Sequence, residues 1–397
     1  MKILMINVVC GIRSTGRICT DLAVELEKQG HEVKIAYGRE HVPEQFQKYA
    51  VKVGTDLDVY THALKARLFD SAGFESKRVT KKFVEWIKEY DPDVIHLHNL
   101  HGYYINVETL FQYLKRCKKR IIWTLHDCWA FTGHCTHFEY IDCNKWMFGC
   151  DKCPQKKEYP GSYIKDCSRY NFFKKKRIFD DIPNMILVTP SEWLRGLVKH
   201  SFLKKYIVEV IHNGIDTSVF KPTKSDIRTK YCIQGKKIIL GVASTWSKKK
   251  GLDAFNYLAR ELPRDYQIIL VGLDKKQIGK IEPNIIGISR TNNVNELAAL
   301  YTIADVFVNP TLEDTYPTVN LEAIACGTPV VTYNSGGSPE SACLYGNVIA
   351  KGDCEELLKA IIHKDSIKMK VTHLNVDYRN TVLQYMELYQ EHIFSKV

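Results

Sequence analysis

Two carboxylates, Asp314 and Glu322, lie in the stretch 301–340, where the chain reads as strand, loop, helix, strand and glycine loop. An apolar, β-branched run ends at Pro310, so a buried strand gives way there to a loop that carries Asp314. A helix expected over 318–325 carries Glu322. Ligands of open parallel sheets bind beyond the carboxyl ends of the strands, so these carboxylates are placed to accept hydrogen bonds from a polar ligand.

A loop of small residues, Ser14, Thr15 and Gly16, follows the first apolar strand at 3–8. Where such a loop opens a helix, the backbone N–H groups and the helix dipole favour an anion. A plain tight turn is the alternative interpretation. The dinucleotide fingerprint Gly-x-Gly-x-x-Gly is absent because only Gly11 and Gly16 are glycines, which disfavours a dinucleotide-dependent dehydrogenase.

Histidines follow two further apolar strands. His96 and His98 lie at the exit of one strand, and His126 follows the strand 120–124. A lone histidine is more often structural than catalytic, but a position just past a buried strand is where a ligand site is expected. The Asp-Pro-Asp sequence that begins at Asp91 precedes its strand, and this placement argues against a metal site there.

The stretch 301–340 contains Asp-x-Tyr-Pro-x-x-x-Leu-Glu-Ala-x-Ala-Cys-Gly-x-Pro-Val-Val, followed by Gly-Gly-x-Pro-Glu. This ordered pattern resembles the donor site of the retaining glycosyltransferases of family 4, including the colanic-acid type of bacterial capsular and exopolysaccharide synthesis. The resemblance implies an α/β protein with the GT-B fold, in which two Rossmann-like domains face each other across a cleft. It also implies transfer of a sugar from a UDP- or GDP-sugar to a glycan or lipid-linked acceptor in surface polysaccharide biosynthesis.

The resemblance assigns roles to individual residues. It implies that Glu322 accepts hydrogen bonds from the ribose hydroxyls and that Asp314 accepts them from the sugar. Lys250 takes the place of the family's phosphate-binding lysine, and His126 that of the histidine that contacts the donor sugar and the reacting centre. The expected catalytic residues are thus His126, Asp314 and Glu322. The expected donor-binding residues are Ser14, Thr15, Gly16, Lys249, Lys250, Tyr316, Thr318 and Glu322.

Three positions depart from the family pattern. Thr245 stands where the family usually has an arginine, Asp314 replaces a glutamate, and Pro317 replaces a glycine whose N–H could donate. One charge of the diphosphate therefore lacks its usual partner unless Lys248 or Lys249 reaches it. The sequence leaves the identity of the donor sugar open.

The resemblance further implies a mechanism without an obvious protein nucleophile. The acceptor hydroxyl attacks from the front face and loses its proton to the departing phosphate, and His126 orients the donor rather than acting as a base. Lys250, a neighbouring lysine and the backbone of 14–16 would neutralise the leaving diphosphate, where negative charge develops. No catalytic metal is therefore expected.

Four of the 13 cysteines, Cys135, Cys143, Cys150 and Cys153, fall close together in the sequence. Cys150-x-x-Cys153 has the spacing of a metal knuckle. Four thiolates suit tetrahedral zinc, but the spacing as a whole matches no standard finger. Structural zinc, reduced buried thiols and disulfides are therefore all open interpretations.

The length of 397 residues predicts two domains. Asn213-Gly-Ile-Asp, with a phenylalanine behind it, resembles the crossing between domains in the family. We expect an N-terminal, acceptor-side domain over 1–215 with a Cys-rich insertion at about 128–170, and a C-terminal nucleotide-sugar donor domain over 216–375. By resemblance, a helix over 376–397 is expected to pack back toward the first domain.

The composition, with 45% hydrophobic and 25% charged residues, is that of a soluble globular protein, and no apolar run reaches the length of a membrane span. The formal charge is +11, and basic clusters occur at 77–82, 115–120 and 174–177. Such clusters suit an anionic membrane surface, or they are solvated helix faces. Nucleic acid is disfavoured because the clusters lack interleaved aromatic residues. We expect a cytoplasmic protein, with peripheral attachment to the inner face of the plasma membrane as one option.

Two other functions share these features. A GT-B nucleotide-sugar epimerase would use the same diphosphate site, but it would need acid and base carboxylates and no acceptor site. A non-catalytic nucleotide-sugar-binding scaffold would fit the departure at Thr245 and the cysteine-rich insertion. The products formed from a panel of nucleotide sugars would distinguish these functions from glycosyl transfer.

Overall fold

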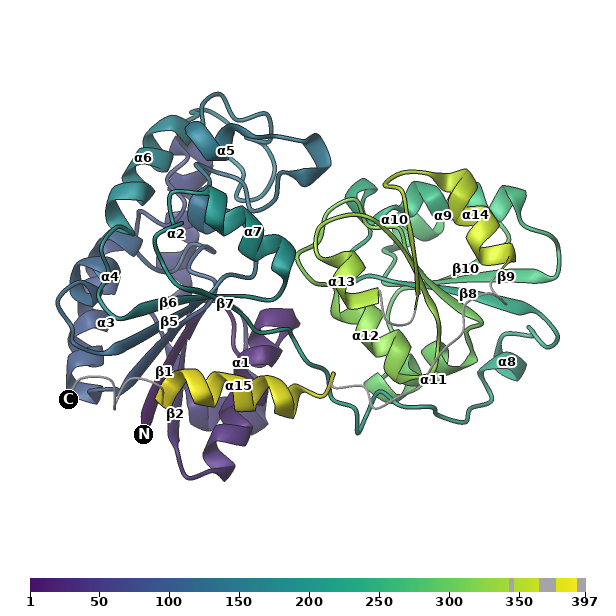
Figure 1. The fold of residues 1–397 in the computed structure, drawn as a ribbon, viewed down its shortest axis with the longest axis horizontal. Coiled ribbons are helices and arrows are strands. Elements are labelled where there is room, and N and C mark those ends of the chain that lie inside the picture. Colours follow the sequence, from purple (N-terminus) through teal and green to yellow (C-terminus); the bar gives the residue numbers. More distant parts are fainter. Residues whose placement is uncertain (343–345, 364–375, 391–397) are drawn as a thin grey trace. The chain divides into compact units, whose positions relative to one another are not determined.

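The computed structural model describes residues 1–342, 346–363 and 376–390 of the chain. These residues form two compact units, each built on one parallel sheet (Figure 1). The first unit comprises Met1–His212 and 381–390, and the second comprises Asn213–Asn380. The chain therefore passes between the units twice. The domain limits expected from the sequence, 1–215, 216–375 and 376–397, stay predictions, and part of the last range lies outside the described residues.

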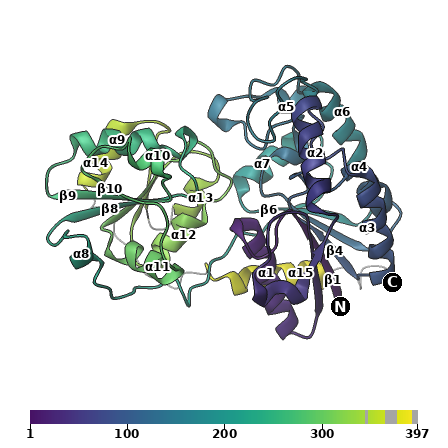
Figure 2. The ribbon, with the colours of Figure 1, turned by 180° about the vertical axis from the view of Figure 1, so that it is seen from behind.

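The first unit contains a seven-stranded sheet in the order β3-β2-β1-β4-β5-β6-β7. Helices lie on both faces of this sheet (Figures 1 and 2). For this reason β1, β4 and β6 are buried along nearly their whole length and read as continuous apolar runs. The strands are β1 (Lys2–Asn7), β2 (Glu32–Tyr37), β3 (Ala50–Lys52), β4 (Val94–Leu97), β5 (Arg120–Thr124), β6 (Met185–Thr189) and β7 (Val208–Val210).

Side-chain caps set the starts of several helices in this unit. Thr55 forms a capping box with Asp58 at the start of α2, and Asn106 and Ser191 cap α4 and α7. The helices are α1 (Arg13–Lys28), α2 (Asp56–Phe69), α3 (Lys77–Tyr90), α4 (Val107–Leu114), α5 (Lys145–Phe148), α6 (Ser168–Ile178) and α7 (Glu192–His200).

The C-terminal helix α15 (Tyr378–Gln390) packs against the sheet of the first unit. The hydroxyl groups of Tyr385 and Tyr389 are buried and lie 2.8 Å from Thr124 Oγ1 and His96 Nδ1 respectively. The helix thus completes a buried hydrogen-bond network at the carboxyl ends of β4 and β5, in which His96 Nε2 also lies 2.8 Å from Thr124 Oγ1.

The second unit contains a six-stranded sheet in the order β10-β9-β8-β11-β12-β13. Its strands are β8 (Lys237–Val242), β9 (Tyr266–Val271), β10 (Ile285–Ile288), β11 (Val306–Asn309), β12 (Val330–Tyr333) and β13 (Gly346–Ile349). Its helices are α8 (Ile227–Lys230), α9 (Leu252–Glu261), α10 (Lys275–Ile278), α11 (Val294–Ile303), α12 (Thr318–Ala325), α13 (Ser338–Ala342) and α14 (Cys354–Ile362). Within the described ranges, no helix is long and apolar enough to cross a membrane.

Candidate functional site

The start of α1 is the first candidate anion site. The sequence pattern predicted that Ser14, Thr15 and Gly16 form a loop before the helix. The helix instead begins at Arg13, so these residues lie in its first turn. No side chain of the described residues caps this end. A Cβ on Gly16 would lie 3.2 Å from the backbone nitrogen of Gly11, so the turn is closely packed. The backbone N–H groups of an uncapped first turn are suited to an anion.

A pair of histidines lies at the carboxyl ends of β4 and β5. His98 follows β4 and His126 follows β5, and His98 Nδ1 lies 2.9 Å from His126 Nε2. The parallel register of these strands pairs Leu97 with Trp123, which brings the residues just beyond them to the same edge of the sheet. Because one imidazole donates and the other accepts, the tautomers of the two rings are coupled.

Both imidazoles are neutral at physiological pH. Burial lowers the pKa of His126 to about 4, although Asp127 opposes this shift, and burial lowers the pKa of His98 well below its usual value. His98 Nε2 has no hydrogen-bond partner among the described residues and borders a cavity lined by both histidines. A neutral, partly buried donor–acceptor pair can orient hydroxyl groups, but an imidazole with so low a pKa is a weak base.

A second polar pair lies beside the histidines. His101 Nε2 lies 2.7 Å from Asp127 Oδ2, and the backbone N–H of Trp129 donates to the other oxygen of Asp127. Burial alone would raise the pKa of Asp127, but the charge and hydrogen bond of His101 lower it to about 2. Asp127 is therefore an anion that holds the turn after β5, which positions His126.

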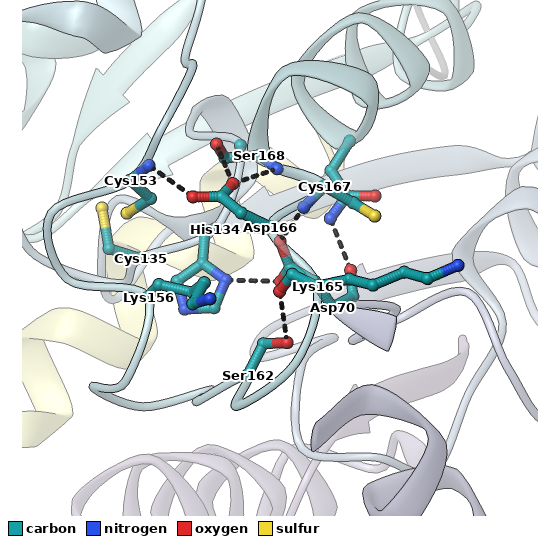
Figure 3. Close-up of polar contacts among 12 residues, drawn as sticks. Asp70, His134, Cys135, Cys153, Lys156, Ser162, Lys165, Asp166, Cys167 and Ser168 are labelled. Atoms are coloured by element: carbon teal, nitrogen blue, oxygen red, sulfur yellow. Dashed lines mark hydrogen bonds and ion pairs between the residues drawn. The ribbon is translucent and has the colours of Figure 1, made fainter. Parts of the chain in front are cut away.

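The Cys-rich segment follows this turn and is tied to α2 by a buried ion pair. His134 Nδ1 bonds to Asp70 just after α2, and Asp70 also accepts from the backbone N–H of Cys167 (Figure 3). Burial would lower the pKa of His134, but Asp70 raises it above its usual value. Lys175, on α6, is also buried, and its ammonium group donates to the carbonyls of Trp129 and Thr132, at 2.7 and 3.1 Å.

The four predicted zinc ligands lie in this segment, and two of them are in contact. The thiols of Cys135 and Cys153 face each other (Figure 3). The hydrogen bond from Cys135 lowers the pKa of Cys153 to about 7. Cys150 is buried and accepts from the backbone N–H of Gly133, while Cys143 is half-buried. Within the described ranges no group of three or more His, Cys, Asp or Glu side chains is arranged to hold a metal ion, so structural zinc stays a prediction.

In the second unit, two lysines and two carboxylates form adjacent ion pairs. Lys250 Nζ lies 2.6 Å from Asp314 Oδ2, and Lys249 Nζ lies 2.8 Å from Glu313 Oε1. The lysines lie in the turn between β8 and α9, and the carboxylates lie in the loop after β11. Because β8 and β11 are neighbours, their carboxyl ends bring these groups together.

Backbone contacts fix the geometry of these pairs. Gly251 has a φ of +76°, and a Cβ there would lie 2.1 Å from the carbonyl oxygen of Pro310. The backbone N–H of Leu312 donates to the carbonyl of Lys249, at 2.8 Å. Only glycine allows this close approach of the two loops. The turn that carries Lys249 and Lys250, which we name the lysine turn, is therefore packed closely against the loop that carries Glu313 and Asp314.

Glu322 lies on α12 and is held from behind by a buried tyrosine. Tyr301 donates its hydroxyl hydrogen to Glu322 Oε2, at 2.9 Å, and Tyr301 itself is fully buried. Glu322 is half-buried. The tyrosine fixes one carboxylate oxygen and thereby directs the side chain.

The start of α12 carries the two other predicted donor contacts. Thr318 is its first residue and is half-buried, and Tyr316 is buried with its backbone N–H 3.3 Å from Asp314 Oδ1. Behind them Asn320 bonds to Asn309 and to Ser341, at 2.9 and 2.8 Å. This buried network ties α12 to the end of β11 and to α13, so the helix start is rigidly placed.

Thr245 is the position at which the family pattern has an arginine. Its side chain is exposed and bonds only to the carbonyl of the preceding Ser244 among the described residues. Lys248, in the same loop, is exposed as well. The site therefore carries its positive charge on the lysine turn.

The predicted residues fall into two groups, one in each unit, and the structure shows direct contacts within the second group, such as that of Lys250 with Asp314. Ser14, Thr15, Gly16 and His126 belong to the first unit, and Lys249, Lys250, Asp314, Tyr316, Thr318 and Glu322 belong to the second. Sequence reasoning missed three partners of these residues, which are the His98–His126 contact, the Lys249–Glu313 pair and the support of Glu322 by Tyr301. The only signal for the first was that His98, like His126, follows a buried strand.

Two family models match the chain. Residues 15–219 match the model described as Glycosyltransferase Family 4, and residues 236–364 match the model described as Glycosyl transferases group 1. Among curated proteins, the chain is 24% identical over 356 residues to WcaC of Escherichia coli (strain K12), which is named as a colanic acid biosynthesis glycosyl transferase. That match covers 86% of this chain and 85% of WcaC.

Solved structures with low sequence identity share the fold. The sucrose-phosphate synthase of Thermosynechococcus elongatus superimposes with a TM-score of 0.69 at 16% identity, and the match covers 98% of both chains. HepE of Anabaena, solved in complex with UDP-glucose, superimposes with a TM-score of 0.66 at 15% identity and the same coverage. These likenesses, with the two Rossmann-like sheets, show the GT-B fold.

Proposed function

Because the chain belongs to glycosyltransferase family 4, we propose that it moves a sugar from a nucleotide-diphosphate sugar to a glycan or lipid-linked acceptor, with retention of anomeric configuration. The observation that carries this proposal is the pair of lysines held by carboxylates at the carboxyl ends of β8 and β11. Two cations beside two hydrogen-bond acceptors suit a ligand that combines phosphate with hydroxyl groups.

We propose that donor binding exchanges the partners of Lys250. In the structure, Lys250 Nζ forms an ion pair with Asp314 Oδ2, at 2.6 Å. The diphosphate would take over the ammonium group of Lys250, and Asp314 would then accept hydrogen bonds from the sugar hydroxyls. Glu322, which accepts from Tyr301, would accept from the ribose hydroxyls as well.

The proposed chemical step needs no protein nucleophile. The acceptor oxygen bonds to the anomeric carbon on the face that the leaving group departs from, and the bond from that carbon to the diphosphate oxygen breaks. The acceptor proton passes to the departing diphosphate. Lys250 and Lys249 would stabilise the charge that develops there, and such stabilisation needs no divalent cation.

His126 serves as an orienting group in this proposal. Its low pKa keeps the ring neutral, so it offers a hydrogen bond and adds no charge to the reacting centre. If His98 donates to His126 Nε2, His126 Nδ1 carries the hydrogen and can donate to a sugar hydroxyl. His98 would then be a positioning residue that selects the useful tautomer.

The likeness to WcaC supports a role in surface polysaccharide biosynthesis. The likeness to HepE, solved with UDP-glucose, supports a UDP-sugar as the first donor to try. The proposed location is cytoplasmic and peripheral, on the inner face of the plasma membrane, because lipid-linked saccharide acceptors are held in a membrane.

A panel of UDP- and GDP-sugars tests the proposal. Each sugar is incubated with the protein with and without a mixture of lipid-linked saccharides, and free nucleotide and sugar products are measured. Slow hydrolysis without acceptor and faster nucleotide release with acceptor are expected for one donor. Formation of an isomeric nucleotide sugar would assign an epimerase instead, and binding without turnover would assign a scaffold.

A further inference from the structure

Helix α2 packs with its small side chains inward and its large apolar side chains outward. It buries His62, Ala63 and Ala66, whereas Leu57 and Tyr60 are 70% and 65% exposed. A helix on the surface of a globular unit normally buries its large apolar residues, so this arrangement is inverted. Figure 2 shows α2 on the near side of the first unit.

A loop of the Cys-rich segment extends this apolar face. The backbone N–H groups of Tyr163 and Lys165 donate to the carbonyls of Arg67 and Leu68, at 2.7 and 3.1 Å, so the loop runs along the end of α2. Tyr163 and Ile164 are 62% and 64% exposed. We name the apolar strip the set made of Leu57, Tyr60 and Leu64, on one face of α2, with Tyr163 and Ile164 of the loop.

Basic side chains border the end of the apolar strip that the loop forms. Lys165 Nζ lies 5.3 Å from the centre of the Phe69 ring. Lys156 Nζ donates to the carbonyl of Ile164, at 3.3 Å. Arg67, near the end of α2, is exposed as well. Lysine and arginine side chains beside apolar surface can lie along it while their charged ends reach polar groups.

The other end of the apolar strip meets a basic groove. Asp58, in the first turn of α2, is close enough to Arg78 and Lys82 of α3 for their charges to help lower its pKa, which the hydrogen bonds of Thr55 lower most. From Lys82 a groove continues between α3 and α4, with a volume of about 710 Å³. Its charged lining consists of Lys81, Lys82, Glu85, Lys88 and Arg116.

Four acidic side chains near the apolar strip have ion-pair or hydrogen-bond partners within the protein, and one of them, Asp166 beside Lys165, accepts from Ser168. Asp56 pairs with Lys52, Asp58 accepts from Thr55, and Glu75 pairs with Lys65. The surface is therefore apolar along its middle and basic at both ends, which is the pattern of segments that lie in the interface of an anionic bilayer. Tyrosines such as Tyr60 and Tyr163 suit that interface because one end of the ring system is apolar and the other polar.

We propose that the apolar strip inserts into the headgroup region of an anionic lipid bilayer and that the basic side chains at its ends bind the lipid phosphates. The occupant is the membrane and not a second copy of the chain, because a copy would bring the same positive charges to the same surface. This inference rests on the proposed function in one respect, since a lipid-linked acceptor lies in such a membrane.

Vesicle sedimentation tests the inference. The full chain is mixed with vesicles of phosphatidylglycerol and phosphatidylcholine in equal parts, or of phosphatidylcholine alone, and the bound fraction is measured at two salt concentrations. Binding is expected only to the anionic vesicles, and it should weaken as salt rises. The triple variant Tyr60→Ser, Leu64→Ser, Ile164→Ser should bind about tenfold or more weakly.

Matched variants separate this surface from general effects. Ile207→Ser removes an apolar side chain of the same unit that is 58% exposed but lies outside the apolar strip, and it should bind like the wild type. Lys165→Glu with Arg67→Glu should weaken binding about tenfold, whereas the exposed Lys199→Glu should have little effect. Circular dichroism and thermal melting establish that each variant is folded.

Three outcomes would overturn the inference. They are failure of the wild type to bind anionic vesicles, equal binding by the triple and Ile207→Ser variants, and a dimer in analytical ultracentrifugation that the triple variant converts to a monomer. UDP-sugar hydrolysis in the absence of vesicles should be the same in the wild type and the triple variant. Loss of vesicle binding with normal hydrolysis therefore reports on the surface alone, and absence of hydrolysis in all variants reports on the proposed function alone.

Discussion

The two candidate groups of residues differ in how they hold charge. In the first unit, His98 is buried and His126 is half-buried, and the two neutral rings are hydrogen-bonded to each other. In the second unit, Lys250 and Asp314 are ionised partners that already lie 2.6 Å apart. The first group can offer orientation without charge, and the second can exchange one charged partner for another. Glycosyl transfer needs both, because a neutral sugar must be positioned while a diphosphate leaves.

The largest expected effect is that of Lys250→Ala. If Lys250 binds the departing diphosphate as proposed, loss of its ammonium group should lower kcat about 100-fold or more. The measurement is nucleotide release with the donor found in the panel. Lys276→Ala removes an exposed lysine of the same unit and serves as the control. Full activity of a folded Lys250→Ala protein would show that the lysine turn is not the diphosphate site.

Glu322→Gln should weaken donor binding by about tenfold, because a hydrogen bond to a charged acceptor becomes a bond to a neutral one. The effect should fall on KM for the donor more than on kcat if the contact is with the ribose. Tyr301→Phe removes only the support behind Glu322 and should have a smaller effect in the same direction. An unchanged KM for both variants would place the ribose elsewhere.

The contrast between the units also predicts different sensitivity to acid. The folded-state pKa of His126 is about 4, below the ordinary value of 6.5, so the unfolded chain binds more protons between these values. His96, with a pKa of about 3, behaves in the same way. Their contribution to stability is present in full above pH 6.5 and is lost as the pH falls toward 4.

Hydrogen exchange of peptides from each unit between pH 7 and pH 4 measures this effect. The first unit should lose protection first, by the order of a few kcal/mol for the buried histidines together. His126→Gln should reduce the dependence on pH. Earlier loss of protection in the second unit would contradict the assignment of neutral buried histidines to the first.

The zinc content of the protein tests a further difference between the two units, because the predicted zinc ligands all lie in the first. If Cys135, Cys143, Cys150 and Cys153 bind one zinc ion, prolonged chelation should lower the melting temperature of the first unit and weaken acceptor binding more than donor binding. Elemental analysis of the purified, active protein should then find about one zinc per chain. A content far below that value would leave reduced thiols or a disulfide as the state of this segment.

The smallest expected effect is that of a brief exposure to EDTA at neutral pH, which should leave transfer activity unchanged. In the proposed mechanism Lys250 and Lys249 would supply the positive charge that a divalent cation would otherwise provide. Rapid loss of activity that Mg²⁺ or Mn²⁺ restores would show that these lysines are insufficient.

Local patterns of the sequence closely predicted one element beside each of the two groups of residues. The helix expected over 318–325 is α12 (Thr318–Ala325), and the strand expected over 120–124 is β5 (Arg120–Thr124). Both are short, buried segments with clear boundaries, such as Pro317 before the helix and Gly327 after it. Apolar periodicity and breaker residues carry this information within a few positions of the chain.

Contacts between distant segments could not be predicted in this way. Lys249 pairs with Glu313 because β8 and β11 are neighbours in the sheet. The order of strands in a sheet cannot be predicted from the sequence of either segment alone. Helix α1 starts at Arg13, which has a φ of +56°, and the uncapped start hid the boundary from the sequence pattern. Side-chain partners such as Tyr301 for Glu322 depend on the packing of α11 against α12.

The return of residues 381–390 to the first unit has a consequence for synthesis on the ribosome. Tyr385 and Tyr389, which cover Thr124 and His96, are translated only after the whole second unit. While the second unit is made, Thr124 and His96 of the nascent first unit therefore lack these two tyrosine partners. The unit that starts first is the one that is completed last, and folding on the ribosome cannot proceed one finished domain at a time.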